Sequence, residues 1–437
     1  MGRRAELKFI QSRRGVPQTT SIRSDVRAVF FLKCRTGMKD CHASRIHRND
    51  IVCGDPSTTG CCSRRPVGHA ETSARGLVRL HPHNDQLHWR GAVVHRALPV
   101  PRQPRQDEVS VSLRRLYRVR LVSLGLTHDV QASTCRGERY LADRQGSDGL
   151  WRDYWLRPGD SEDWVSACCT LALVRQPAAA EAGMAAARAG GRALLAARRP
   201  GGWGYNRSTV TDADSSAWAL RALAALGWAG VRQGELLLRT YLDDDGRAHT
   251  FMPPEEADAW GHAHADVTPV VGIALIACGA SPASIAQVRQ SIVADQSAQG
   301  DWPSFWWAGN AYATARSIEF LSHSGGIPEV CAQRARHWLQ KTAQIDHPFD
   351  ATQCLSIGAL LGEPCDRVLD ALLDNQRGEG SWPSSPALLT PSRESGNAGS
   401  EGHHDSECVL GTAMVLMALK SWLANDARRR PMSRLGF

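Results

Sequence analysis

The sequence predicts an all-α fold, an (α/α)6 toroid built from six helical hairpins and preceded by an irregular N-terminal extension. Three observations predict it. A short glutamine–glycine–tryptophan motif recurs along the chain, six strongly apolar segments follow at similar intervals, and the first 120 residues show neither feature. Regular internal repetition of this kind is typical of architectures built from stacked helical hairpins.

The recurring motif is a glutamine, a glycine four residues later and a tryptophan two residues beyond it. Full copies stand at Gln145, Gly149 and Trp151, at Gln296, Gly300 and Trp302, and at Gln376, Gly380 and Trp382, and a partial copy at Gly201, Gly202 and Trp203 has Ala197 in the glutamine position. A glutamine near a helix C-terminus can donate to unpaired carbonyls, glycine tolerates the positive φ that ends a helix, and an indole covers the junction. We expect these residues to staple the repeats together and to touch no substrate.

The second helix of each hairpin is dominated by Ala, Leu, Ile and Val. Six such segments begin near Asp163, Asp214, Asp266, Tyr312, Asp350 and Asp405. Helices that are apolar on all sides are buried ones, whereas the segments at 182–197 and 334–343 carry spaced arginines and are predicted as outer helices. Six repeats with nearly identical helix starts favour a closed toroid over an open helical solenoid.

A closed toroid places the N-termini of all six inner helices around one mouth of the barrel. Five of the six predicted starts carry an aspartate. For Asp163, Asp266 and Asp350 we expect the local role of an N-cap, in which the carboxylate accepts hydrogen bonds from amides of the first helical turn. The same geometry gathers acids, histidines and aromatic side chains around one cavity. A ring of helix N-termini is also a favourable binding site for an anion.

The formal net charge of +8 is unevenly distributed. Residues 1–120 hold 24 Lys+Arg and 9 Asp+Glu, a charge of +15, and the remaining residues therefore carry −7. The repeat region shows no basic patch, so we expect no nucleic-acid partner. No apolar run approaches the roughly 18 residues that a transmembrane helix needs, which leaves peripheral contact as the membrane interaction to consider.

Composition divides the chain into a basic extension at 1–120, the predicted toroid at 121–425 and a basic tail at 426–437. The extension is rich in Arg, His, Ser, Pro and Cys, lacks periodicity and carries no secretory signal. It is interpreted either as a disordered segment or as sequence that does not belong to the native protein. Several of the thirteen cysteines lie in apolar helical segments as small hydrophobes, so we expect a cytoplasmic protein.

The sequence RGERYLADRQGSDGLW at residues 136–151 resembles the repeat signature of the squalene cyclase/oxidosqualene cyclase and protein prenyltransferase β-subunit superfamily. The resemblance is specific because the signature repeats, and it covers about residues 125–425. It implies an α/α toroid that holds a hydrophobic isoprenoid in an apolar central cavity, with no cofactor expected. The full cyclases carry a second helical domain that completes the pocket, so a single toroid leaves room for a homodimer or a partner subunit at the mouth.

A second resemblance concerns the sequence DADSSA at residues 212–217. It is similar to the D-x-D-D-T-A motif of protonation-initiated, class II terpene cyclases, in which the middle aspartate is the general acid. That role maps onto Asp214, and the first motif aspartate maps onto Asp212. Ser215 replaces the third aspartate, and Ser216 the threonine. This departure leaves open a class II isoprenoid cyclase, an epoxide-cyclising variant, a different acid arrangement or no cyclase activity.

A cyclase of this kind also needs neighbours that stabilise a carbocation, and aromatic faces do so by cation–π attraction. The candidate substrate-binding residues lie near the predicted helix starts, and they are Trp164, Trp218, Trp307, Tyr312, Asp163 and His264. The alternative for the aromatic residues is ordinary core packing at helix junctions.

The prenyltransferase branch of the superfamily implies a zinc ion bound by Asp, Cys and His at the barrel mouth. The candidate ligands here are His403, His404, Asp405 and Cys408, of which Asp405 and Cys408 share the spacing of one helix face. A capped helix with exposed histidines explains them equally. Besides the cyclase, two functions therefore stay open: a prenyltransferase-like subunit with a metal at the mouth, and a non-catalytic toroid that binds a hydrophobic ligand or partner.

Overall fold

The computed structural model describes residues 106–174, 181–228, 230–342, 347–394, 396 and 400–429. The predicted basic extension lies almost wholly outside the described residues, as does most of the predicted C-terminal tail. Within the described part of the chain the fold is almost entirely helical, with two small two-stranded sheets.

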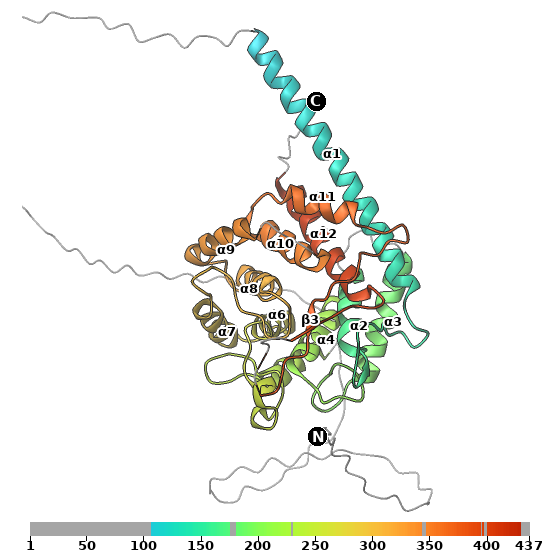
Figure 1. The fold of residues 1–437 in the computed structure, drawn as a ribbon, viewed down its shortest axis with the longest axis vertical. Helices are drawn as coiled ribbons and strands as arrows, with labels where there is room; N and C mark the ends of the chain where they lie inside the picture. The colour runs from blue at the N-terminus through green and yellow to red at the C-terminus, as the bar shows by residue number, and fades with distance from the viewer. Residues whose placement is uncertain are drawn as a thin grey trace, which may run out of the picture. The chain divides into compact units, whose positions relative to one another are not determined.

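Six helices form an inner ring (Figure 1). They are α2 (Asp163–Val174), α4 (Ala213–Ala225), α6 (Thr268–Cys278), α8 (Ala311–His323), α10 (Pro348–Leu361) and α12 (Val409–Arg429). Each packs against the next, and α12 packs against α2, so the ring is closed. The predicted toroid is therefore confirmed, and the physical reason is that these helices are apolar around their whole circumference.

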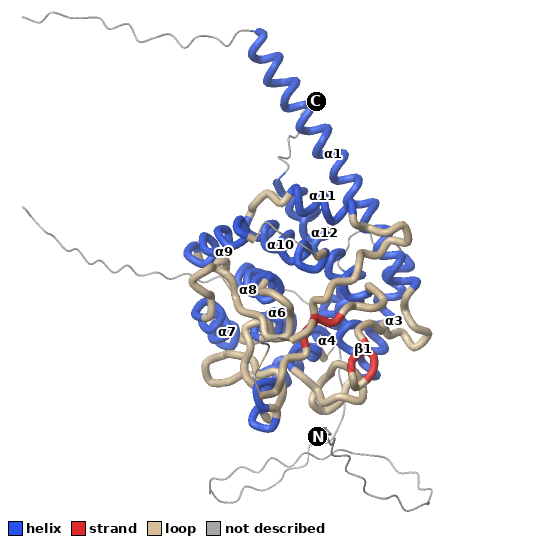
Figure 2. The backbone as a smooth tube through the Cα atoms, viewed as in Figure 1, coloured by secondary structure: helices blue, strands red, loops and turns tan. Residues whose placement is uncertain are grey.

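The outer helices alternate with the inner ones along the chain. They are α1 (Gln106–Asp143), α3 (Glu181–Ala197), α5 (Gly234–Arg239), α7 (Pro282–Ala294), α9 (Glu329–Lys341) and α11 (Asp366–Asp374). Loops between outer helices and the inner helices that follow (Figure 2) carry the remaining elements, except η1, which lies between α4 and α5. These are the pair β1 (Trp155–Leu156) and β2 (Gly159–Asp160), the 3-10 turns η1 (Val231–Gln233), η2 (Pro254–Glu256) and η3 (Asp258–Gly261), and the pair β3 (Leu388–Leu389) and β4 (Gly402–His403).

The three motif glutamines each link their own repeat to a neighbouring outer helix. Gln145 donates from Nε2 to the carbonyl of Gly149 at 2.8 Å and to that of Ala186 on α3 at 2.9 Å. Gln296 does the same with Gly300 and with Cys331 on α9, both at 3.0 Å. Gln376 reaches Ser133 on α1, which joins the sixth repeat to the first.

The motif tryptophans are fixed at both of their nitrogens. The indole Nε1 of Trp151 donates to Leu141 at 2.7 Å, and its amide donates to the hydroxyl of Ser166 at 2.8 Å. Trp203, Trp302 and Trp382 repeat this pattern with carbonyls of their own outer helices and with a Ser or Thr of the following inner helix. Satisfying a buried indole locally is what makes this residue a staple.

Gly300 shows why the motif requires glycine. Its φ is +100°, in the region that favours glycine, and a Cβ there would collide with the carbonyl of Arg334 on α9. The tight approach lets Gln296 reach the neighbouring outer helix. The predicted stapling role of the motif is thus visible in the hydrogen bonds.

The inner helices begin within four residues of the predicted positions, but the N-cap prediction is wrong for all three aspartates. Asp163 is the first residue of α2, and its carboxylate accepts from Gly204 instead of from the first turn of α2. Asp350 lies inside the first turn of α10, whose N-cap is His347. Asp266 precedes α6, and its Oδ2 accepts from the amides of Phe305 and Trp306 in the next repeat. Sequence alone could not reveal this because the partner amides lie about 40 residues away.

Helix α12 begins at Val409, later than Asp405. The amides of Val409 and Leu410 donate to Oδ2 of Asp153 from the first repeat, at 2.8 and 2.9 Å. Burial raises the pKa of Asp153 to about 7, with the charge of Asp405 adding to the effect. The cap of this helix therefore comes from a residue more than 250 positions earlier, and it ties the ends of the ring together.

In the described part of the chain, no helix combines the length and apolarity that crossing a membrane requires.

Candidate active site

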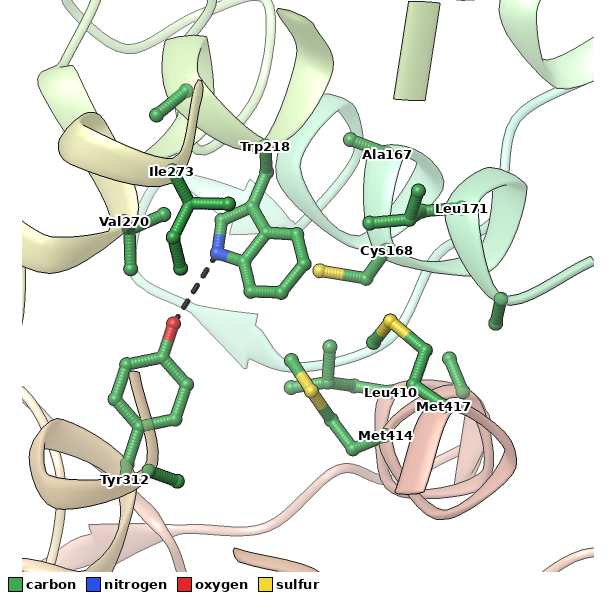
Figure 3. Packing of buried hydrophobic residues seen from close by; sticks show 14 of the residues in the cluster. Ala167, Cys168, Leu171, Trp218, Val270, Ile273, Tyr312, Leu410, Met414 and Met417 are labelled. Carbon is green, nitrogen blue, oxygen red and sulfur yellow. Dashed lines mark hydrogen bonds between the residues drawn. The ribbon is translucent and has the colours of Figure 1, made fainter. Parts of the chain in front are cut away.

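The lumen of the barrel is lined by one face of each inner helix. On α4, Asp214, Trp218 and Arg221 follow at intervals of four and three residues, which places them on one helix face. On α8, Tyr312, Arg316 and Glu319 repeat these intervals. The two faces meet, because Trp218 donates from Nε1 to the Tyr312 hydroxyl at 3.2 Å (Figure 3). Arg221 also pairs with Glu319 at 2.7 Å.

Asp212 is the N-cap of α4, with an extended backbone (φ −136°, ψ 163°). Its Oδ1 accepts from the amide of Ser215 at 2.7 Å, and its Oδ2 accepts from the Ser215 hydroxyl at 2.8 Å. Burial raises the pKa of Asp212 to about 7, while both hydrogen bonds from Ser215 lower it. The residue that replaces the third motif aspartate therefore supports Asp212.

Asp214 follows in the first turn of α4 and is half-buried. Its Oδ1 is buried and has no hydrogen-bond partner among the described residues. Burial raises the pKa of Asp214 well above its usual value, the charges of Asp212 and Asp266 raise it further, and Arg221 and Arg316 oppose them. The physical effect is to favour a neutral carboxylic acid that still has a proton to give.

Six aromatic rings form a continuous cluster, and one of them, Tyr312, lies near enough to Asp214 for that charge to raise its pKa. Trp164 stacks on Tyr154 with 5.7 Å between ring centroids and lies 6.0 Å from Trp307. Trp307 in turn stacks on Tyr312 at 4.3 Å and on Phe349 at 4.8 Å, while Tyr205 stacks on Trp164 at 6.5 Å. These faces provide the electron density that stabilises a cation. Of the predicted residues, Trp164, Trp307 and Tyr312 are brought together here.

Trp218 lies deeper in the lumen and is fully buried. Cys168 of α2 and Met414 and Met417 of α12 point toward its indole (Figure 3). The guanidinium of Arg221 lies 4.2 Å from the centre of the Trp218 ring system. The predicted residue thus occupies the middle of the barrel, between the level of Asp214 and the charged residues beyond it.

His264 lies in a different cluster, contrary to its predicted place beside the other substrate-binding residues. Its ring stacks on Phe305 at 3.8 Å and meets Trp306 edge-on, and Trp306 contacts Trp260 and Phe251. Its Nε2 lies 3.0 Å from the carbonyl of Ala259, and burial lowers its pKa to about 4. The histidine is therefore neutral near pH 7 and serves to hold the loops of the third and fourth repeats together.

The loop of the sixth repeat crosses the mouth beside these residues. The amide of Leu389 donates to Trp306 and the carbonyl of Ala387 accepts from Ala308, both at 2.8 Å. Further along, the carbonyl of Pro391 accepts from the indole of Trp260 at 2.8 Å. This crossing positions the backbone on both sides of Trp307.

Asp163 is fully buried at the start of α2, where Oδ2 lies 3.5 Å from both the amide of Gly204 and a guanidinium nitrogen of Arg199. Burial raises its pKa. It therefore joins the loop of the second repeat to α2, in the way that Asp266 joins the third repeat to the fourth.

The four candidate metal ligands do not converge. His403 bonds Thr390 at 2.6 Å and His404 bonds Ser384 at 3.2 Å, whereas Asp405 accepts from the amides of Ser385 and Gly411. The thiol of Cys408 is approached by Arg377. Within the described ranges, no three His, Cys, Asp or Glu side chains are grouped as a metal site.

The sequence reasoning missed several lumen residues. Phe349, Tyr154 and Tyr205 belong to the aromatic cluster, and Arg221, Arg316, Glu319 and Gln353 form a charged group deeper in the barrel. One signal could have found the second group. Charged residues at intervals of three and four from Asp214 and Tyr312, inside otherwise apolar helices, indicate a polar stripe on the lumen face.

Solved structures with this fold support the architecture. A variant of the type II terpene cyclase MstE from Scytonema is 23% identical, covers 69% of this chain and 99% of its own, and superposes with a TM-score of 0.62. Another MstE variant, in complex with geranylgeranyl dihydroxybenzoate, is 22% identical with the same coverage and a TM-score of 0.61. A protein from Actinoplanes is 27% identical, covers 67% of this chain and 99% of its own, and gives a TM-score of 0.57.

No protein-family model matches the sequence, and no curated protein is similar to it. The solved structures show that this chain has the fold of the terpenoid-cyclase toroid. A fold does not determine a reaction, so the chemistry has to be argued from the residues of the lumen.

Proposed function

We propose that this protein catalyses the protonation-initiated cyclisation of a linear isoprenoid, with Asp214 as the general acid. The observation that carries the proposal is the environment of Asp214. Burial and two neighbouring carboxylates raise the pKa of this aspartate, which lies in the first turn of α4 and interacts electrostatically with Tyr312, one of six clustered aromatic rings. Acid and cation-stabilising surface are what this reaction needs in one place.

The reaction balances without a cofactor. Asp214 transfers its proton to one carbon of a terminal alkene, and the other carbon becomes a tertiary cation. A second alkene of the chain attacks this cation, which forms a carbon–carbon bond and moves the positive charge along the substrate. Loss of a proton from the final cation to a base or water yields a cyclic isomer of the substrate, and Asp214 is reprotonated from solvent.

The aromatic cluster serves the middle of this sequence. Trp307 stacks on Tyr312 at 4.3 Å and meets Trp164 at a tilt of 60° and 6.0 Å, so a cation formed beside Asp214 meets a group of adjoining aromatic rings. The same surface excludes water, which would otherwise capture the cation as an alcohol.

The substrate class follows from the lumen and from the structural neighbours. The lumen is lined by aromatic, thioether and aliphatic side chains at the level of Trp218 (Figure 3). Variants of MstE have been solved in complex with the substrate geranylgeranyl dihydroxybenzoate and with the product merosterolic acid A. Both observations support an isoprenoid, with or without a polar head group.

The test is product analysis by mass spectrometry on the full-length chain. The panel is squalene, its epoxide, farnesyl and geranylgeranyl diphosphates and a geranylgeranylated dihydroxybenzoate. We expect a cyclic product of unchanged mass that is lost in Asp214→Asn. Asp370→Asn on α11, an exposed aspartate far along the chain from the lumen residues, is the matched control and should retain activity.

Two outcomes would replace the proposal. Binding of the panel without any product, unchanged in Asp214→Asn, would favour a hydrophobic-ligand-binding toroid. Transfer of a prenyl group to an acceptor, dependent on added zinc, would favour the prenyltransferase alternative.

A further inference from the structure

A cavity of about 60 Å3 lies at the far end of the lumen from Asp214. Its walls come from α8, α10 and α12, and its polar lining residues are Arg316, Glu319, His323, Thr352, Gln353, Ser356 and Ser421. The apolar part of the wall is Leu360, Met414 and Met417. The interior of the barrel is thus apolar and aromatic near Asp214, and it is polar and charged around this cavity.

The cavity wall carries charged side chains of both signs. Arg221 and Arg316 both pair with the carboxylate of Glu319, which is the one acidic side chain among the described residues that line the cavity. All three side chains are at least nine-tenths buried. Arg316 itself lines the cavity, so an anion bound there would meet a guanidinium in a region of low dielectric, where charge-assisted hydrogen bonds are strong.

Gln353 provides a second, independent indication of a ligand. Its side chain is fully buried and lines the cavity, and its Oε1 accepts a long bond of 3.4 Å from Arg316. Its Nε2 has no hydrogen-bond partner among the described residues, and neither has the Nε of Arg316. Buried donors are almost always paired in folded proteins, so two of them beside one cavity point to a missing acceptor.

The position of this cavity fits one end of a linear substrate. Seven residues separate Asp214 from Arg221 on α4, and at 1.5 Å per residue this spacing places Arg221 about 10 Å further along the barrel axis. Trp218 lies between the two levels, facing Cys168, Met414 and Met417 (Figure 3). Methionine side chains adapt readily in shape, so a flexible chain can pass between the indole and this wall.

We propose that the Arg316–Gln353 cavity binds a carboxylate head group of the isoprenoid, so that the substrate is an acid whose remote alkene lies at Asp214. The inference rests on the proposed function, since it takes the isoprenoid chain to occupy the lumen. Arg316 and Gln353 donate to the carboxylate oxygens, and the flanking hydroxyls of Thr352 and Ser356, which donate to helix carbonyls, add no positive charge. The alternative explanation for the unpaired donors is that about two buried waters occupy the cavity.

The experiment compares three probes with the same chain: farnesoic acid, methyl farnesoate and farnesol. Binding to the full-length protein is measured at pH 8 by quenching of tryptophan fluorescence, which reports on Trp218 and its neighbours. We expect the acid to bind about tenfold more tightly than the ester or the alcohol, since charge-assisted hydrogen bonds are about twice as strong as neutral ones.

Variants assign this preference to the cavity. Arg316→Met and Gln353→Leu should each reduce it severalfold, because they weaken binding of the acid more than binding of farnesol. Gln353→Glu places a second carboxylate in the cavity and should make the alcohol the preferred probe. Arg336→Met, which removes an arginine from outer helix α9, is the matched control and should keep the full preference.

Equal affinity for acid and alcohol in the wild-type protein would overturn the inference and indicate waters only. So would a preference that survives in Arg316→Met, Gln353→Leu and Gln353→Glu alike. These results are separable from the proposed function. A cyclised product without any preference for the acid would contradict the head-group site alone, whereas acid preference without a cyclised product would contradict the cyclase alone.

Discussion

The hydroxyl of Ser215 donates to Oδ2 of Asp212 at 2.8 Å, while the Ser215 amide donates to Oδ1 of the same carboxylate at 2.7 Å. One residue thereby fixes both oxygens of the helix cap. The serine that stands in place of a third motif aspartate consequently orients Asp212, and Asp212 in turn lies at the start of the helix turn that carries Asp214. Ser215 thus differs from the aspartate of the motif that this sequence resembles, but it still supports the carboxylate of Asp212 with two hydrogen bonds.

Replacing Ser215 with alanine should remove one of these two bonds. The folded protein loses a buried hydrogen bond to a carboxylate, so we expect the free energy of unfolding to fall by about 1–2 kcal/mol. The Ser215 hydroxyl lowers the pKa of Asp212, and its loss should therefore raise that pKa above about 7. Urea denaturation at pH 8 measures the first effect. An unchanged unfolding free energy would show that the hydroxyl does not support Asp212.

Asp212→Asn should change the pH dependence of product formation. A general acid works in its protonated form, so activity is present below the pKa of Asp214 and lost as pH rises through it. The charge of Asp212 raises that pKa. Because asparagine caps helices as well as aspartate, the substitution removes the charge but keeps the cap.

The falling limb of the pH–rate profile should accordingly move to lower pH in Asp212→Asn. The measurement is initial product formation between pH 5 and 9, with Asp370→Asn as control. A falling limb at the wild-type pH would mean that Asp212 does not affect the pKa of Asp214. A falling limb at higher pH would mean that Asp212 lowers this pKa instead of raising it.

Gln376→Leu tests how the ring is closed. The side chain donates to the carbonyls of Gly380 and Ser133, both at 2.9 Å, and its Oε1 accepts from the Ser133 hydroxyl at 2.8 Å. Leucine leaves these groups without partners, so the free energy of unfolding should fall by about 2–3 kcal/mol. Thermal unfolding of the variant is compared with that of Gln299→Leu, which replaces an exposed glutamine. Equal melting temperatures would contradict the stapling role.

Asp266 should make stability depend on pH. Burial raises its pKa from 3.8 to about 6. The protonated form is therefore favoured by folding, and the stability it contributes is fully present below about pH 4 and lost as pH rises through 6. Both amide bonds go to Oδ2, so the single oxygen of asparagine can accept them in Asp266→Asn.

Relative to the wild type, Asp266→Asn should gain up to about 3 kcal/mol in unfolding free energy between pH 4 and pH 7, as two pKa units correspond to that amount. Urea denaturation at the two pH values gives the difference directly. A difference that is the same at both would show that Asp266 titrates normally in the folded protein.

The fold could be predicted because its signals are local. The spacing of Gln145, Gly149 and Trp151 describes one helix end, and its recurrence counts hairpins without knowledge of long-range contacts. The apolar composition of the inner helices then places them inside. Helix α12 begins later than the sequence predicts because its cap is Asp153, a residue of the first repeat that is distant in the sequence.

The site was predictable only where a motif marked it. Asp212 and Asp214 lie where the motif indicates, and Trp164, Trp307 and Tyr312 meet as expected of residues at helix starts. The ion pair between Arg221 and Glu319 could not be predicted because the two residues are 98 positions apart in the sequence. His264 was misplaced because stacking on Phe305 depends on a loop path that the sequence does not specify.

The most direct test of the account is the fate of the solvent proton. The full-length chain is incubated in D2O with whichever panel isoprenoid it cyclises, and the product is examined by mass spectrometry. Protonation by Asp214 predicts one deuterium in the cyclic product from D2O, none from H2O, and no product from Asp214→Asn. A cyclic product that carries no deuterium, or one that Asp214→Asn forms at the wild-type rate, would contradict the central claim.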